Sequence, residues 1–173
     1  MKKSSKGFSL IELLIVVAII LIIAAIAIPN LLRSRIAANQ ASAVGSLRTL
    51  NTAEVTYSST FNTGFSSFLS ELGPPAAGQN PTSTFAGLID EVLSGIGVAG
   101  GTASVGNNSA KSGYNFAYTP GVADTSGRID TYSFIAVPVS SSTGTNYYFT
   151  DQSGVLRQNS TTTASSTDSP IAG

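Results

Sequence analysis

The chemistry open to this sequence depends on few side chains, because the chain contains no His and no Cys. The usual Ser-His-Asp triad, the commonest zinc sites and any disulfide are therefore excluded. The most unusual ionisable group is Glu12, the sole charge in an otherwise apolar run between Lys6 and Pro29. An acid in a low-dielectric environment is costly unless an opposite charge meets it. Glu12 therefore indicates either a residue at a water boundary, in contact with a helix dipole, or an ion pair with an amine that forms when helices assemble.

Two further groups of side chains offer weaker sites. Asp151 with Ser153, or Asp124 with Asp130, supply oxygen ligands of the kind that calcium prefers, but calcium takes about six to eight of them. The spacing is not that of a recognised calcium loop, and a tight turn over residues 151–154 explains Asp151 without an ion. We therefore expect no cofactor, with calcium at these residues as the alternative.

Other patterns that suggest catalytic or cofactor sites have simpler explanations. The sequence GIGVAG at residues 95–100 has the spacing of a dinucleotide-binding turn, but it follows an expected helix rather than a strand, so we interpret it as a loop. Asp90 and Glu91 are expected on a solvated face rather than as an acid/base pair. Ser-Lys chemistry at Lys111 is a hydrolytic route that the absence of His leaves open.

The element that must position Glu12 is the apolar segment itself. Residues 8–28 would form a helix roughly 31 Å long at about 1.5 Å per residue, close to the thickness of a bilayer's hydrocarbon core. Lys2, Lys3 and Lys6 precede it, which favours a cytoplasmic N-terminus and an exported remainder. The alternative from another class is an ordinary signal peptide, cleaved after Ala27 to release a soluble exported binding domain or enzyme. The length of the run and the presence of Glu12 weigh against it.

The stretch KGFSLIELLIVVAIILIIAAIAIPNLLRSR resembles the N-terminus of a type IV prepilin. It has a short basic leader, residues 1–7, that ends in Gly7, followed by Phe8, by Glu12 four residues later, and by an apolar run that reaches Pro29. The resemblance implies that a prepilin peptidase cleaves between Gly7 and Phe8 and methylates the new Phe8 amine. It also implies that Glu12 pairs with the Phe8 amine of a neighbouring subunit during assembly.

The resemblance implies a function without enzymatic activity. The chain would be an inner-membrane single-pass precursor that becomes a structural subunit of an extracellular type IV pilus-like filament, a homo-oligomer built with an assembly ATPase and platform proteins. A type II secretion pseudopilin or a minor pilin is the nearest alternative. The chain has no basic footprint for nucleic acid. Pilins often carry a Gly inside the apolar run, and here Pro29 is the residue expected to break the helix, with local melting over residues 21–29.

Beyond Pro29 the pattern becomes that of an amphipathic helix, the outer half, over residues 29–60. Its apolar residues recur at helical spacing on one stripe, which Glu54 interrupts and on which we expect a head domain to pack. The stripe consists of Ile36, Ala43, Leu47, Leu50, Tyr57 and Phe61. The fold class is therefore α+β, and the resemblance implies the pilin-like arrangement, in which the outer half of the helix packs on an antiparallel sheet.

The expected head comprises residues 61–157. A long connection rich in Gly and Pro leads to a short helix over residues 84–94. Strands are expected at residues 114–118, 132–139, 146–150 and 155–158, with Tyr148 and its two neighbours on opposite sheet faces. Residues 158–173 are rich in Ser and Thr and are expected to form a mobile tail. Pilins frequently close the C-terminal loop with a disulfide, which this chain cannot do.

Overall fold

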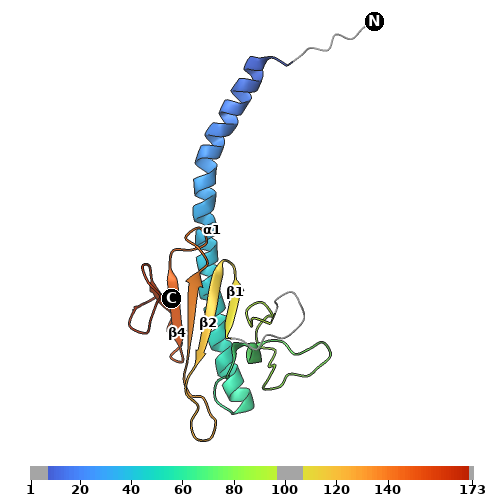
Figure 1. Ribbon diagram of the computed structural model, residues 1–173, viewed down its shortest axis with the longest axis vertical. Helices are drawn as coiled ribbons and strands as arrows, with labels where there is room; N and C mark the ends of the chain where they lie inside the picture. The colour runs from blue at the N-terminus through green and yellow to red at the C-terminus, as the bar shows by residue number, and fades with distance from the viewer. Residues whose placement is uncertain (1–7, 97–106, 172–173) are drawn as a thin grey trace. The chain divides into compact units, whose positions relative to one another are not determined.

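The computed structural model describes residues 8–96 and 107–171 (Figure 1). The expected leader, residues 1–7 with Gly7, lies outside these described residues, as do residues 97–100 of the glycine-rich segment. The described part begins with helix α1, Leu10–Phe61, which is followed by the 3-10 helix η1, Leu69–Leu72. The strands follow as β1 (Asn108–Lys111), β2 (Tyr114–Pro120), β3 (Tyr132–Pro138), β4 (Tyr147–Asp151), β5 (Arg157–Asn159) and β6 (Ser169–Pro170).

Helix α1 passes through two compact units, residues 1–35 and residues 36–173, the second of which we call the head unit. The helix begins after Ser9, whose carbonyl accepts the Leu13 amide at 3.2 Å. It ends at Phe61 because the next residue, Asn62, takes a left-handed conformation with φ of 55°. The sequence predicts an end near Thr60, one residue earlier.

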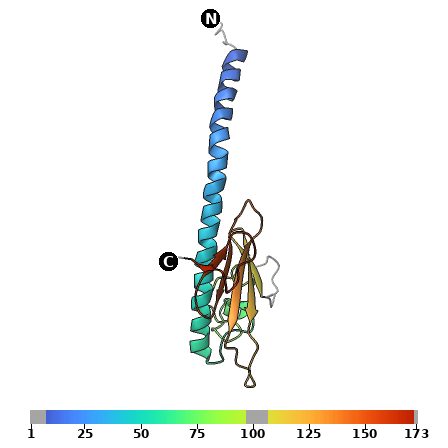
Figure 2. The same ribbon diagram turned by 90° about the vertical axis from the view of Figure 1, so that its left-hand side faces the viewer.

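The core of the head unit lies between the second half of α1 and one face of the sheet (Figure 2). On the helix it includes most of the expected stripe: Ala43, Leu47, Leu50 and Tyr57 are buried, and Phe61 packs against them half-buried. Ile36, the first residue of the expected stripe, is half-buried and lies outside this core. On the sheet, alternate residues of β2 and β3 face the same core, because successive strand side chains point to opposite faces. These residues are Tyr114, Phe116, Tyr118, Tyr132, Phe134 and Ala136. The prediction of an α+β fold with a long N-terminal helix is confirmed.

The sheet has six strands in the order β1-β2-β3-β4-β5-β6, and every neighbouring pair is antiparallel. Four strands correspond to those expected from the sequence, and Tyr148 is buried while its two neighbours are half-buried. The expected turn also forms: the Ser153 amide donates to the Asp151 carboxylate at 2.9 Å, and Gly154 takes a φ of +72°. The edge strands β1 and β6 are too short and polar to show strand periodicity in the sequence.

The expectation of a tail after residue 158 is wrong for the described residues. Strand β6 pairs with β5, and Ala164 is buried with 3% of its surface exposed. The segment contains almost no large apolar residues, so its place depends on backbone and side-chain hydrogen bonds. The Asn159 amide group, for example, donates to the Asp168 carboxylate at 2.8 Å. Hydropathy alone does not predict such a network.

The short helix expected over residues 84–94 does not form. Residues 86–89 instead run beside η1, where the Ala86 amide donates to the Glu71 carbonyl at 2.7 Å and the Leu88 amide to the Leu72 carbonyl at 2.9 Å. These bonds use amides that a helix would need for itself. Residues 91–95 are turns, in which the Asp90 carboxylate accepts the Leu93 amide at 2.9 Å. The apolar spacing that favoured a helix reflects burial of Ala86, Ile89 and Leu93 in the core.

We expect Gly64→Ala to lower the free energy of unfolding of the chain by roughly 2 to 4 kcal/mol. Gly64 has a φ of +88°, and an added Cβ would overlap the backbone of Ile129, whose carbonyl accepts the Phe65 amide at 2.7 Å. Gly78→Ala is the matched control, because Gly78 has a φ of +81° but open space around it, and it should cost only about 1 kcal/mol. Urea unfolding of the full chain in detergent, followed by circular dichroism, measures both. Equal losses in the two variants would contradict the steric explanation.

Candidate assembly site

The start of α1 brings together the backbone and the acid that the sequence analysis singled out. The Ser9 amide donates to the Glu12 carboxylate at 2.9 Å, and Phe8 lies next to this bond with 77% of its surface exposed. The helix N-terminus also carries a partial positive charge that favours an acid in the first turn. Glu12 is therefore held at the helix start, within a few residues of Phe8. Gly7 lies outside the described residues.

The contact between Ser9 and Glu12 was missed in the sequence, although a signal for it exists. Ser9-Leu10-Ile11-Glu12 has the S-x-x-E spacing of a capping box, in which the acid three residues into a helix reaches back to the amide of the capping residue. The structure shows this hydrogen bond from the Ser9 amide to the Glu12 side chain. Only the Oε2 atom of Glu12 accepts it, so the carboxylate keeps capacity for a further donor.

The first half of α1 exposes its apolar side chains on all sides. Nearly every residue from 10 to 32 is exposed, and no part of the most apolar window is buried. Among the described residues, α1 is the one helix long and apolar enough to cross a membrane. An apolar surface of this size is not stable in water and has to be covered by lipid or by other protein surfaces.

The expected helix break at Pro29 is not observed. Helix α1 is continuous from Leu10 to Phe61, with Pro29 inside it. A proline has no amide hydrogen, so one helical hydrogen bond, to the carbonyl of Ala25, cannot form. The neighbouring turns, built from strong helix formers, keep the helix intact. Melting near Pro29 during assembly stays a prediction.

A second acid on α1 has an unexpected environment. The sequence predicts that Glu54 interrupts the buried stripe, and this is wrong: Glu54 is fully buried, with 0% of its surface exposed. The Ser66 amide donates to Glu54 at 3.0 Å and the Ser66 hydroxyl donates at 2.7 Å. The Tyr118 hydroxyl donates to the Ser66 carbonyl at 2.6 Å. Glu54 therefore ties α1 to the segment that follows it and, through Ser66, to strand β2.

The ionisation of Glu54 is strongly affected by this environment. Burial raises its pKa to about 7, although the hydrogen bonds from Ser66 act in the opposite direction. Burial and the nearby Glu54 charge also raise the pKa of Tyr118 and Tyr132. No ion pair in residues 8–96 and 107–171 involves Glu54. The sequence indicates this burial by position, because Glu54 lies seven residues after Leu47 and three before Tyr57, on the buried stripe.

The expected calcium ligands serve as turn and ion-pair residues. Asp124 accepts the amides of Ser126 and Arg128 at 2.8 and 2.9 Å, and Asp130 pairs with Arg128 at 2.6 Å. Asp151 and Ser153 form the turn already described. Among the described residues, no group of at least three His, Cys, Asp or Glu side chains could hold a metal ion.

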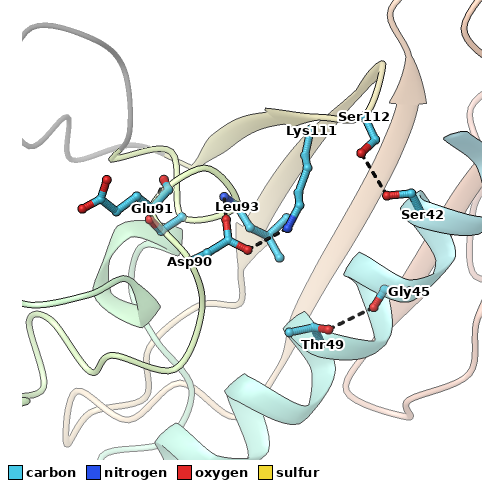
Figure 3. Close-up of polar contacts among 9 residues, drawn as sticks. Ser42, Gly45, Thr49, Asp90, Glu91, Leu93, Lys111 and Ser112 are labelled. Atoms are coloured by element: carbon cyan, nitrogen blue, oxygen red, sulfur yellow. Dashed lines mark hydrogen bonds and ion pairs between the residues drawn. The ribbon is translucent and has the colours of Figure 1, made fainter.

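The remaining catalytic candidates lie at the edge of the sheet (Figure 3). The Lys111 ammonium lies 2.7 Å from the Asp90 carboxylate, while Glu91 is exposed and directed away from this pair. The hydroxyl of the next residue, Ser112, accepts a hydrogen bond from Ser42 rather than contacting Lys111. The pair Asp90 and Lys111 therefore links the residue 90 turn to β1.

Residues 2–28 match the family model described as the prokaryotic N-terminal methylation motif. The resemblance inferred from the sequence is thereby confirmed.

Two curated relatives are pilus proteins. The chain is 45% identical over 69 residues to the type IV major pilin protein PilA of Myxococcus xanthus, which is 40% of this chain and 31% of that protein. It is 65% identical over 37 residues to the type IV wide pilus major component PilA4 of Thermus thermophilus, 21% of this chain and 28% of that protein. The match thus spans about a third of the length of each relative. No solved structure matches the chain.

We expect the stability of the chain to fall as the pH rises from about 4.5 to 8, because of Glu54. The pKa of Glu54 is raised from 4.5 to about 7 in the folded state. Its contribution is therefore fully present below pH 4.5 and is lost as the pH passes 7, by roughly 3 kcal/mol at about 1.36 kcal/mol per pKa unit. Glu54→Gln should remove most of this slope and be at least as stable as the unaltered chain at pH 8.

Urea unfolding at a series of pH values measures the slope. Glu91→Gln is the control, because it changes an exposed acid and should leave the pH dependence in place. If Glu54→Gln retained the full slope, the assignment to Glu54 would be wrong.

Proposed function

We propose that this chain is a structural subunit of a type IV pilus-like filament. The observation that carries the proposal is the methylation motif over residues 2–28, in which Glu12 is the sole acid. A prepilin peptidase would cleave the leader after Gly7 and methylate the amine of Phe8. Before cleavage, residues 8–28 would anchor the precursor in the inner membrane, with the N-terminus in the cytoplasm and the head unit outside.

The proposed role of Glu12 follows from its position at the helix start. Cleavage before Phe8 creates a positive amine, and a carboxylate on a neighbouring copy can pair with it once both leave water. Two opposite charges in a low-dielectric environment attract strongly and tolerate little displacement, so the pair would set the register between copies. The bond from the Ser9 amide supports this role, because it fixes the orientation of the carboxylate while leaving one oxygen available.

The exposed apolar surface of α1 would be covered first by lipid and then by the helices of other copies. Small residues in the run, Ala18, Ala24, Ala25 and Ala27, permit close helix approach. Transfer from lipid to a helix bundle gains little from the hydrophobic effect, so assembly would need an external energy source. This supports an assembly ATPase and platform proteins as partners. We propose no enzymatic activity for the chain itself.

A pseudopilin of a type II secretion system or a minor pilin would share the same motif and fold. The names of the two relatives, a major pilin and a major pilus component, favour a main filament subunit. A soluble exported domain released by signal peptidase would begin at Ile28, so its first residue would distinguish it from a pilin.

The first test is the N-terminus of the protein in sheared surface material. We expect fibres by electron microscopy in which this chain is the main component, and mass spectrometry of the subunit should give a methylated Phe8 as its first residue. A subunit that starts at Ile28 would replace the proposal with a released soluble domain. A correctly processed chain found only in the cell envelope would favour a pseudopilin.

The second test is Glu12→Leu. An unpaired buried charge costs about 3 to 5 kcal/mol, so removal of the acid should leave the Phe8 amine without a partner and reduce filament yield at least tenfold. Glu91→Leu, which changes an exposed acid outside the apolar run, is the control and should leave the yield unchanged. Quantitative immunoblots of sheared fibres, normalised to the chain in the membrane fraction, measure the effect. Full assembly of Glu12→Leu would contradict the docking role.

A further inference from the structure

The surface of the head unit has a groove that is lined mainly by residues of α1. It has a volume of about 300 Å³, well above the roughly 30 Å³ share of one water molecule. We call it the α1 groove, and its lining residues are Arg48, Thr49, Thr52, Ala53, Thr56 and Leu88. Arg48, Thr49 and Thr52 are exposed, and Thr56 and Leu88 are half-buried. The proposed function does not yet account for this surface.

The hydroxyl groups in the α1 groove are already committed as donors. Thr49 donates to the Gly45 carbonyl at 3.1 Å, a bond that Figure 3 shows, and Thr52 donates to the Arg48 carbonyl at 3.0 Å. Thr56 donates to the Thr52 carbonyl at 2.8 Å. A free phosphate would therefore find donors only on Arg48. Since the threonines also bring methyl groups, the groove is better suited to an apolar side chain with one acid beside it.

The loop between β2 and β3 carries that combination of side chains. It projects past the ends of the two strands (Figures 1 and 2), and Val122 in it is 96% exposed, the highest value among the exposed large apolar side chains. Asp124 lies two residues further on. Its Oδ1 atom accepts the bonds from Ser126 and Arg128, which hold the loop in shape and lower the pKa of Asp124, while Oδ2 accepts none of them.

The charges of the two surfaces are complementary. Arg48 is the sole basic residue of α1 in the head unit, where acidic residues outnumber basic ones. The ion pairs found in residues 8–96 and 107–171 join Lys111 to Asp90 and Arg128 to Asp130. Neither includes Arg48 or Asp124. An arginine and a preorganised carboxylate, both exposed, are thus available to a second molecule.

We propose that the α1 groove of one copy receives the β2–β3 loop of a second copy, so that Val122 contacts the threonine methyl groups and Leu88 while Asp124 pairs with Arg48. The loop and the groove are different surfaces of one chain. A contact of this kind is heterologous, and when its rotation does not close a ring it propagates into an open helical filament. The inference rests on the proposed function, to which it adds a contact between head units.

The experiment uses the absence of cysteine in the chain, which makes an introduced pair unique. Thr52→Cys and Val122→Cys are introduced together in the full chain, and sheared filaments are oxidised and separated under non-reducing conditions. A disulfide requires Cα atoms about 4.4 to 6.8 Å apart, so the double variant should give a ladder of multimers that reductant removes. Thr52→Cys with Val155→Cys is the matched control, because Val155 is also an exposed valine in a strand-to-strand turn.

A double-mutant cycle gives an independent readout. Asp124→Asn removes the charge but keeps the Oδ1 acceptor that holds the loop in shape. Arg48→Gln and Asp124→Asn should each reduce filament yield at least threefold, and the two together should reduce it no further than either alone. Asp151→Asn is the control, because Asp151 accepts the Ser153 amide in the same kind of turn on another hairpin. It should leave the filament yield unchanged.

The outcomes separate the two proposals. A ladder from the Val122 pair alone, together with losses from Arg48→Gln and Asp124→Asn that do not add, supports the contact. Filaments that form normally but show no ladder, or equal ladders from Val122 and Val155, overturn the contact and leave the filament function in place. An unaltered chain that forms no filaments under any condition overturns both.

Discussion

Helix α1 carries two apolar surfaces, one in each half of the helix, and the two surfaces require different partners. Over residues 10–32 the apolar side chains are exposed all around the helix. In the second half of the helix, the buried apolar side chains lie on one stripe, which becomes part of the core of the head unit. The head unit satisfies the second surface within the chain, by covering the stripe with β2, β3 and β4. The first surface has no such cover, so the same helix that completes the fold also requires an environment outside it.

Two acids on α1 show how the chain handles a charge among apolar residues. Glu54 is satisfied inside the head unit by two donors of Ser66, and its burial keeps it costly to ionise. The role of Glu54 is structural, because its bonds to Ser66 hold the segment after α1 against the helix and β2. Within the described part of the chain, Glu12 accepts a hydrogen bond from the Ser9 amide. A positive partner from another copy would complete the environment of Glu12, which is why the proposed pairing concerns Glu12 rather than Glu54.

The parts of the fold that the sequence predicts are those with strong periodicity. The stripe on α1 and the aromatic alternation of β2 and β3 follow from burial on one face, and burial is what periodicity records. The errors have a common physical cause. Residues 84–94, β1, β6 and the Ser/Thr-rich segment are placed by hydrogen bonds, as between Ala86 and Glu71, rather than by an apolar periodicity. Glu54 was misjudged because hydropathy treats a buried acid as an interruption, although Ser66 satisfies it. The site at Glu12 could be predicted from the sequence because a local motif marks it.

The C-terminal segment shows what replaces a covalent closure in a chain without cysteine. Strand β6 is held by its pairing with β5, and the Arg157 guanidinium donates to the Asp168 carbonyl at 2.8 Å. The Ile171 amide adds a bond to the Leu156 carbonyl at 2.8 Å. Each such bond is worth about 1 kcal/mol net, whereas a disulfide typically contributes about 2 to 4 kcal/mol. The closure is therefore distributed over several weak contacts, and contacts from neighbouring copies in a filament would add to its stability by mass action.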